Sequence, residues 1–348
     1  MKREGNLLGF VKDPIVVIGI IFFLYPLIPV IGKYTALGTE LLIWGMFALS
    51  FNLVLGYTGL PSFGHGAFYG IGTYAAALTS IHLLGGEGLL LPMIVAALAG
   101  GFFTLVYGYV IRKKRGIYFA LLTVAFSQVM YVIAFRWDEV TGGETGITGL
   151  RRADLFGFIN MDSSVSFYYL VFVIFIAAVI IIRKIANSSI GRILYSIQQD
   201  DRRARYLGYD SDKYVWLAFT ISGVFAGLAG GMYCLLHSAA FSDILHWVKS
   251  GDVVMATLLG GGFANFWGPF VGGLIFIVAR EFLSAFWDNW MLVYGLAFVA
   301  IILFIPTGLM GIVQQIQERR HVRAQRGAIS ASQKGEEPQQ SQKEEDKS

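Results

Sequence analysis

Cysteine, charge and proline are all scarce in this chain of 348 residues. Its single cysteine, Cys234, excludes an internal disulfide and any metal site built from several thiolates, and its apolar neighbours indicate a small core side chain. Only 14% of the residues are charged, against 55% that are hydrophobic, a balance far from that of soluble domains. The sequence has 8 prolines but 42 glycines. These features predict a polytopic membrane protein.

Signatures of enzyme chemistry are missing as well. No Walker-type phosphate loop, no His-Glu-x-x-His pair, no nucleophile elbow and no metal-ligand spacing occurs in the sequence. We therefore expect no enzyme activity, no cofactor and no metal site, and we expect ATP to be hydrolysed only by separate partner chains. The net charge of +4 falls mostly between apolar runs, so it indicates membrane topology rather than nucleic-acid binding.

Long apolar runs separated by short polar breaks fill most of the first 312 residues. Because unpaired backbone groups are intolerable in lipid, runs of this length predict α-helices rather than a β-barrel. The first run has about 19 residues and no small-residue cleavage site, so we interpret it as a retained span rather than a signal peptide. The runs fall near residues 14–32, 37–56, 66–84, 89–111, 116–135, 166–182, 214–236, 251–280 and 288–312.

Four basic clusters, near residues 2–3, 112–115, 183–213 and 319–326, are placed in the cytoplasm by the positive-inside rule. Spans that alternate in direction place the first three clusters in the cytoplasm. A cytoplasmic C-terminus then requires the run 251–280 to begin and end on the outer side. The glycine-rich break at residues 260–269 would let two short helical pieces form a re-entrant hairpin. We predict an all-α fold of about eight transmembrane helices plus this hairpin, with both termini in the cytoplasm.

This topology divides the chain into three parts. Residues 1–13 form a cytoplasmic N-terminus, and residues 14–312 form the transmembrane domain. Residues 313–348 form a cytoplasmic tail that, from about residue 327 onward, consists largely of Gln, Glu, Lys and Ser. Such a composition offers almost nothing to bury, so the tail is expected to be largely disordered.

One polar stretch, residues 187–209, interrupts the apolar pattern and belongs to the cytoplasm by the charge rule. Apolar residues recur in it at helical spacing and charged residues fill the remaining positions, which predicts a short amphipathic helix from Ile190 to Leu207. Gly208 supplies a natural C-terminal stop. A membrane protein without an energy source of its own would need such a helix to bind a soluble partner.

Ionisable side chains within the apolar runs are few. Glu40 and Asp252 stand at the edges of runs, and Arg280 and Glu281 stand beside a loop. Carriers driven by protons or ions usually keep such groups within the membrane, so their scarcity also favours energy delivered from another chain. His65 lies in a glycine-rich turn, where it is either a ligand or gate residue or, more simply, a packed side chain.

Three stretches combine helix-breaking residues with polar groups: 56–66, 141–146 and 260–269. Broken backbone is tolerated in a membrane only when it is buried or lines a cavity. In transporters, broken helices offer N–H and C=O groups to small polar solutes. The first and third stretches therefore indicate a solute pathway, with close packing of helices at glycine as the alternative.

Several linked motifs resemble those of one family. They include Ser62-Phe-Gly-His-Gly-Ala-Phe-Tyr-Gly-Ile-Gly-Thr-Tyr74, Arg115-Gly-Ile-Tyr-Phe-Ala-Leu-Leu-Thr-Val-Ala-Phe126 and Thr141-Gly-Gly143. They continue, in order, through residues 189–192, 204–209, 222–230, 250–252, 259–262 and 268–269. Over residues 14–312, the chain resembles the permease subunits of bacterial branched-chain amino acid ABC importers. The longer N-terminus and the run at Arg115 resemble the LivM type.

The resemblance implies a subunit of the bacterial inner membrane that pairs with a second, homologous permease. Two cytoplasmic ATPase subunits would drive it, and an extracytoplasmic solute-binding protein would deliver leucine, isoleucine or valine. Surrounded by membrane lipid, the chain would form half of the translocation pathway and work by alternating access. The apolar stripe of the predicted cytoplasmic helix would dock into an ATPase groove while its charges fix the register.

Three sets of candidate residues follow from the patterns and the resemblance. For coupling to the ATPase they are Gly191, Arg192, Ile193, Leu194, Ile197, Asp200, Arg202, Ala204, Leu207 and Gly208. For the substrate pathway they are Asn52, Ser62, Gly64, His65, Gly66, Tyr69, Gly260, Gly261 and Gly262. For contact with the binding protein they are Thr141, Gly142, Gly143 and Thr145.

Other functions share part of this pattern. A permease of the same build could carry urea or a short amide, because related subunits share the visible motifs. A secondary carrier, a channel or an inactive membrane scaffold would lack a reason for the dedicated cytoplasmic helix. The solute itself cannot be read from the sequence, since importers of this kind place much of their selectivity in the separate binding protein.

Overall fold

A computed structural model describes residues 14–27, 34–155, 159–261, 266–286, 289, 291–293, 295–296 and 299. Within these ranges the chain is mostly helical, and seven helices are long and apolar enough to cross a membrane. The predicted all-α membrane fold is therefore confirmed. The predicted N-terminus, the C-terminal tail and most of the last span, residues 288–312, lie outside the described residues.

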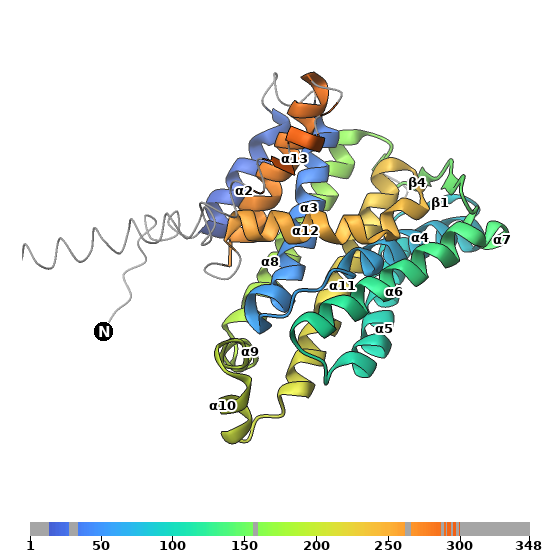
Figure 1. The fold of residues 1–348 in the computed structure, drawn as a ribbon. Helices are drawn as coiled ribbons and strands as arrows, with labels where there is room; N and C mark the ends of the chain where they lie inside the picture. The colour runs from blue at the N-terminus through green and yellow to red at the C-terminus, as the bar shows by residue number, and fades with distance from the viewer. Residues whose placement is uncertain are drawn as a thin grey trace, which may run out of the picture.

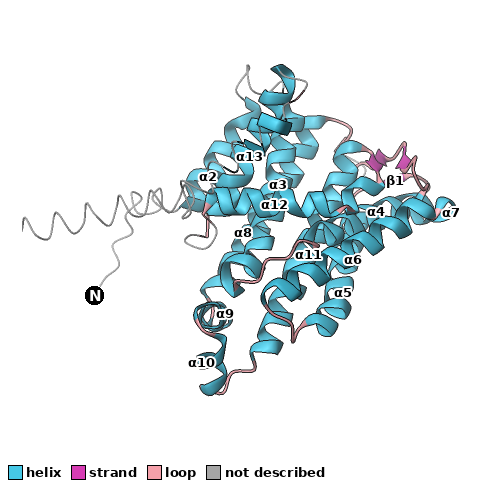
Figure 2. Ribbon diagram, viewed as in Figure 1, coloured by secondary structure: helices cyan, strands magenta, loops and turns pink. Residues whose placement is uncertain are grey.

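The helices follow the apolar runs closely (Figures 1 and 2). A short helix, α2 (Pro14–Leu24), continues into the 3-10 turn η1 (Tyr25–Leu27). The long helices are α3 (Thr35–Thr58), α4 (His65–Leu84), α5 (Leu90–Ile111), α6 (Gly116–Arg136), α8 (Ser164–Asn187), α11 (Ser211–His237) and α13 (Gly268–Phe286). The short elements are α7 (Asp138–Thr141), α9 (Ser189–Gln199), α10 (Asp201–Tyr206), η3 (Ser242–Leu245) and α12 (Trp247–Gly260).

Four strands of two residues each tie the loops at one end of the molecule together. β1 (Glu87–Gly88) pairs in parallel with β3 (Arg151–Arg152), and β2 (Ile147–Thr148) pairs antiparallel with β4 (Ala239–Ala240). Figure 1 shows β1, β4 and α7 far from α9 and α10. The two ends of the molecule therefore carry different structures: a loop cluster at one and the short polar helices at the other.

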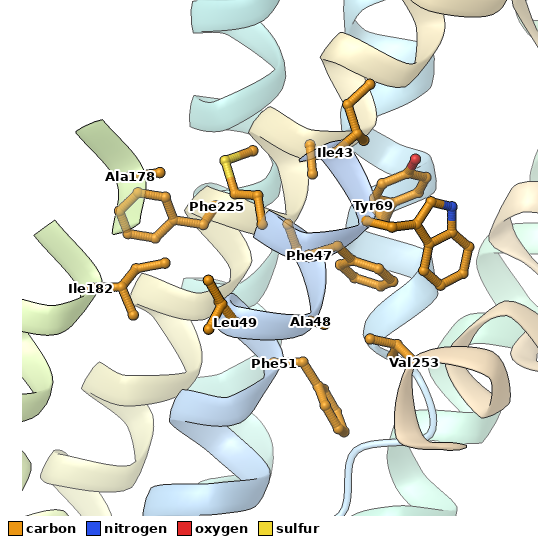
Figure 3. Packing of buried hydrophobic residues seen from close by; sticks show 14 of the residues in the cluster. Ile43, Phe47, Ala48, Leu49, Phe51, Tyr69, Ala178, Ile182, Phe225 and Val253 are labelled. Atoms are coloured by element: carbon orange, nitrogen blue, oxygen red, sulfur yellow. The ribbon is translucent and has the colours of Figure 1, made fainter. Parts of the chain in front are cut away.

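α3 is the centre of the fold. Nearly all of its side chains are buried, and it contacts α8, α11, α12 and α13. Figure 3 shows Phe47 and Phe51 of this helix among residues from α4, α8, α11 and α12. Because lipid is as apolar as a protein core, such packing depends on close fit rather than on escape from water. Other helices meet backbone to backbone. A Cβ added at Gly72 of α4 would overlap the carbonyl of Gly227 on α11, and one added at Gly100 of α5 would overlap the carbonyl of Gly223 on α11.

The run 251–280 contains the predicted break. α12 ends at Gly260, Gly261 has a φ of 84° that favours glycine, and α13 begins at Gly268. In Figure 1, α12 lies across the middle of the molecule and α13 leads to the end away from α9 and α10. Only α12, with 14 residues, is a short piece; α13 has 19 residues and is longer than predicted.

The polar stretch 187–209 forms two helices, so the prediction of one continuous helix is wrong. The backbone breaks at Asp200, whose carboxylate accepts hydrogen bonds from the N–H groups of Arg202 and Arg203 at 3.0 and 3.1 Å. Capping by an acidic side chain starts α10 in a new direction. The predicted stop is correct: Gly208 follows α10 with a φ of 91°. We call Ser189–Tyr206 with Leu207 and Gly208 the coupling segment.

Candidate functional site

The coupling segment is anchored to the long helices by its apolar side. Leu194 and Ile197 are 1% and 4% exposed, and α9 contacts α3, α8 and α11. Gly191 and Ala204 are buried too, and Ile193 is half-buried. Leu194 and Ile197 therefore pack against this chain and do not face outward, and the coupling of this segment to an ATPase stays a prediction. The stripe covers apolar surface at the ends of the long helices, which would otherwise meet water.

The exposed side of the coupling segment carries both charge and large apolar groups. Arg192, Arg202 and Gly208 are exposed, and Asp200 is half-exposed at the break. Leu207 is 74% exposed and its neighbour Tyr206 is 88% exposed. Sequence reasoning missed Tyr206 and the exposed Tyr195, although tyrosines in a charged stretch outside the membrane were a usable signal. Exposed aromatic side chains of this kind are enriched at protein interfaces.

Four charged side chains connect the coupling segment to the helices behind it. Arg115, at the start of α6, donates to Asp212 of α11 at 2.8 Å and lies 3.5 Å from Asp201 of α10. Arg205 of α10 forms ion pairs with the same two carboxylates, and its hydrogen bond to Asp212 raises its pKa above the ordinary value. This network joins α6, α10 and α11. Sequence reasoning did not select Arg115, Asp201, Arg205 or Asp212 as coupling residues.

The coupling segment also contacts the extended stretch 59–64, which joins α3 to α4. Gly59 has a φ of 72°, and a Cβ added to it would lie 3.2 Å from Cγ of Gln198 on α9. The same stretch meets α6, since the Phe63 N–H donates to the Thr123 hydroxyl at 3.1 Å. At Gly64, an added Cβ would overlap the carbonyl of Thr123. We call residues 59–64 the crossing segment.

His65 begins α4 immediately after the crossing segment and is fully buried. Its Nε2 lies 2.8 Å from the Ser222 hydroxyl, which in turn donates to the backbone carbonyl of Ser50. Because a hydroxyl has one proton to donate, Nε2–H of a neutral imidazole must be the donor to Ser222. The ring is enclosed by Phe47, Phe51, Phe68 and Phe219. This geometry supports the packing role rather than a ligand or gate role.

Other pathway candidates are also buried, and several offer polar atoms without a partner. Among the described residues, nothing hydrogen-bonds to the Asn52 amide, the Ser62 hydroxyl or the Tyr69 hydroxyl. The Thr257 hydroxyl on α12 is in the same state and was not predicted. An unsatisfied buried polar group costs about 1–3 kcal/mol. Four such groups on neighbouring elements favour a functional use of this region.

The glycines of the pathway set act at close backbone contacts. The Gly66 N–H donates to the Ser250 hydroxyl of α12 at 2.8 Å, which fixes α4 to α12. A Cβ at Gly260 would overlap the Gly268 carbonyl, so the α12–α13 corner requires glycine. Gly262 lies outside the described residues. The structure thus gathers the crossing segment and the start of α12 around α4.

The predicted binding-protein contact lies in the loop cluster at the end opposite α9 and α10 (Figure 1). Thr141 is buried at the end of α7, where its hydroxyl oxygen lies 2.6 Å from the carbonyl oxygens of both Ala134 and Trp137, which share its one proton. Gly142 and Gly143 have φ values of 72° and 55° and form the turn that follows. Of the four candidates, Thr145 alone is exposed. Thr141, Gly142 and Gly143 therefore shape the loop, which presents Thr145.

In the described part of the chain, no group of three His, Cys, Asp or Glu side chains is placed to hold a metal ion. The coupling segment offers an exposed surface to a partner. The ion network lies behind this surface, and the buried crossing segment lies beside it.

The chain is similar to several known permease proteins. Permease protein LivM of Salmonella typhimurium, named for high-affinity branched-chain amino acid transport, is 27% identical over 298 residues, or 79% of this chain and 69% of that protein. LivM of Escherichia coli is 27% identical over 297 residues, with the same coverage of both chains. LivH of Escherichia coli, another permease of that name, is 25% identical over 290 residues, or 77% of this chain and 91% of LivH. No solved structure matches the chain.

The family model described as "branched-chain amino acid transport system / permease component" matches residues 35–304. This range runs from the start of α3 through all seven long helices and includes both the crossing and coupling segments. The chain, with seven membrane-length apolar helices among its described residues, is a multi-pass membrane protein that belongs to the branched-chain amino acid transport permease family.

Proposed function

We propose that this chain is a permease subunit of an ATP-driven importer for leucine, isoleucine and valine in the bacterial inner membrane. Relatives of two kinds, LivM and LivH, are both named as permeases for branched-chain amino acid transport. Their presence supports a pair of homologous permeases, of which this chain supplies one half of the pathway. Two cytoplasmic ATPases supply the energy, and an extracytoplasmic binding protein supplies the solute.

The observation that carries this proposal is the contact between the coupling segment and the crossing segment. Gln198 of α9 lies against Gly59, and the ion network ties α10 to α6, whose Thr123 holds Phe63. A partner that moves the coupling segment therefore acts on both ends of the crossing. An ATPase beneath the membrane would use these contacts to switch the face to which the pathway opens, which requires a bistable element.

The ATPase binds the exposed side of the coupling segment in this proposal. Tyr195, Tyr206 and Leu207 supply the apolar contact, and Arg192 and Arg202 fix the register through charge. Leu194 and Ile197 keep α9 attached to the permease instead. This assignment places α9 and α10 in the cytoplasm and the loop cluster with Thr145 on the outer side, where the binding protein docks.

Uptake measurements test the proposed solute. A strain that lacks this chain should lose most of its uptake of ¹⁴C-leucine, and the intact gene should restore it. Unlabelled isoleucine and valine should compete, whereas urea should not. Unchanged leucine uptake in the deletion strain, or competition by urea alone, would refute the proposal.

A docking test addresses the partner. Tyr206→Ser and Leu207→Glu should reduce co-purification of the ATPases with the permease, since these side chains protrude from α10 and make little contact with the permease. Tyr34→Ser is the matched control, because Tyr34 is also exposed but lies at the start of α3, at the opposite end of the molecule. Equal recovery of the ATPases with all three variants would exclude this docking surface.

A further inference from the structure

Glu40 and Arg280 are paired in the structure, although they are 240 positions apart in the sequence. Nη2 of Arg280 donates to Oε1 of Glu40 at 2.8 Å, and the two side chains are only 21% and 13% exposed. The sequence suggested that Arg280 stands beside a loop, but it does not. It lies inside α13, about 9 Å before the end of that helix, and Glu40 lies about 8 Å inside α3. Charges at such depth are costly and are retained for function by default.

A second pair of opposite charges lies nearby on α12. Nζ of Lys249 is 3.8 Å from the Asp252 carboxylate, a loose contact within one helix. Lys249 also lies over the ring of Trp44, 5.9 Å from its centroid. Trp44 is one helical turn from Glu40, and it stacks on Phe276, which is one turn from Arg280. The Trp44–Phe276 stack thus connects the two pairs.

An unpaired hydroxyl is directed to the same region. Tyr69 is 3% exposed, its hydroxyl has no hydrogen-bond partner among the described residues, and its ring contacts Phe47 of α3 (Figure 3). Phe47 in turn packs edge to face on Trp44, the ring over which Lys249 lies. The two pairs and the hydroxyl therefore belong to one polar region on α3, α4, α12 and α13.

Charge balance identifies the kind of ligand. The two cations and the two mostly shielded carboxylates, Glu40 and Asp252, sum to zero, so the shielded part of the region attracts neither a free anion nor a free cation. A third carboxylate, that of Glu281, also pairs with Arg280, but its side chain is 49% exposed and its charge is screened by water. Both hydrogen bonds of Arg280 come from Nη2, and within the described chain its Nε and Nη1 make none. Nη2 already serves the carboxylates of Glu40 and Glu281, so a further carboxylate, that of a solute, can bind at Nε and Nη1 in a charge-assisted contact. Asp252, held only loosely by Lys249, can accept an ammonium group.

We propose that Glu40, Arg280, Lys249, Asp252 and Tyr69 form a binding station for zwitterionic α-amino acids within the pathway. Arg280 binds the carboxylate of the solute, Asp252 and Glu40 receive its ammonium group, and the Tyr69 hydroxyl completes the polar contacts. This inference rests on the proposed transport function and adds to it the residues that recognise the backbone of the solute. Selection among apolar side chains occurs elsewhere.

Amide variants test the station in cells that contain the complete importer. Arg280→Gln and Asp252→Asn should each lower the initial rate of ¹⁴C-leucine uptake about 10- to 100-fold, as expected for loss of a charge-assisted contact. Asp210→Asn is the control, because it also removes a carboxylate charge but lies at the start of α11, away from the station, where Asp210 pairs with Lys213. It should change uptake by less than about twofold.

A charge swap separates recognition from structure. Glu40→Arg combined with Arg280→Glu preserves the ion pair between α3 and α13, so the protein should co-purify with its partners at wild-type levels while uptake stays low. Recovery of wild-type uptake by the swap would show that the pair is purely structural and would overturn the station. If the swap does not assemble, Asp252→Asn decides, because it leaves the Glu40–Arg280 pair intact; unchanged uptake in that variant also overturns the station.

Wild-type cells distinguish this inference from the proposed function. Uptake of glycine or alanine, but not of leucine, isoleucine or valine, would refute the proposed solute and support the station for zwitterions. Absence of uptake of every amino acid tested, with or without uptake of urea, would overturn both.

Discussion

Replacing Asp212 by Asn should uncouple ATP hydrolysis from transport. The Asp212 carboxylate binds both Arg115 of α6 and Arg205 of α10, and its side chain is 17% exposed. A hydrogen bond between charged groups contributes about 1.5–3 kcal/mol when shielded, and an exposed ion pair contributes less than about 1 kcal/mol. The two bonds are partly shielded, so their loss should cost about 2 kcal/mol in total and lower the equilibrium constant for docking α10 onto α6 about 30-fold.

The assay is the number of leucine molecules transported per ATP hydrolysed by the purified complex in proteoliposomes. Asp212→Asn should lower this ratio about tenfold while ATP turnover continues, since the ATPases keep their docking surface but α6 no longer follows α10. Asp210→Asn is the matched control: Asp210 caps α11 and pairs only with Lys213, and asparagine caps equally well. A wild-type ratio in Asp212→Asn would refute transmission through this network.

Three further predictions concern the crossing segment, the attachment of α9 to the long helices and the ion network. Gly64→Ala should reduce leucine uptake severalfold because the added Cβ meets the Thr123 carbonyl. Gly251→Ala, in open space on α12, is the control and should leave uptake unchanged. Equal uptake in both variants would contradict the role of the contact between Gly64 and Thr123. Leu194→Ala should destabilise the purified complex by about 2–5 kcal/mol, measured by thermal unfolding, whereas Tyr195→Ala should cost less than about 1 kcal/mol. Arg115→Leu combined with Asp212→Asn should be no worse than either change alone; additive losses of transport would show that the two residues act separately.

Much of the fold could be predicted because lipid imposes simple rules on sequence. The long helices follow the apolar runs, and the break near Gly261 stands where a glycine-rich stretch interrupts a run. Gly208 ends the coupling segment as its conformational freedom predicts. Local chemistry decides these features, so they are visible without knowledge of distant contacts.

Two of the differences between expectation and structure arise where side chains far apart in the sequence meet, and one arises from a local contact. The helical periodicity of residues 190–207 did not indicate a break at Asp200. The break forms because the Asp200 carboxylate caps a new helix, and this capping competes with continuation of the first helix. The stripe with Leu194 and Ile197 faces the permease because the ends of α3, α8 and α11 require cover. Likewise, the partner of Arg280 lies in α3, which only the tertiary fold brings to α13.

ATP-dependent uptake of ¹⁴C-leucine by proteoliposomes that contain this chain, its partner permease, the ATPases and the binding protein tests the central claim most directly. We predict accumulation that requires ATP, is competed by isoleucine and valine, and falls when the coupling segment carries Tyr206→Ser and Leu207→Glu. Leucine uptake that proceeds equally without ATP, or is indifferent to these changes in the coupling segment, would contradict the account.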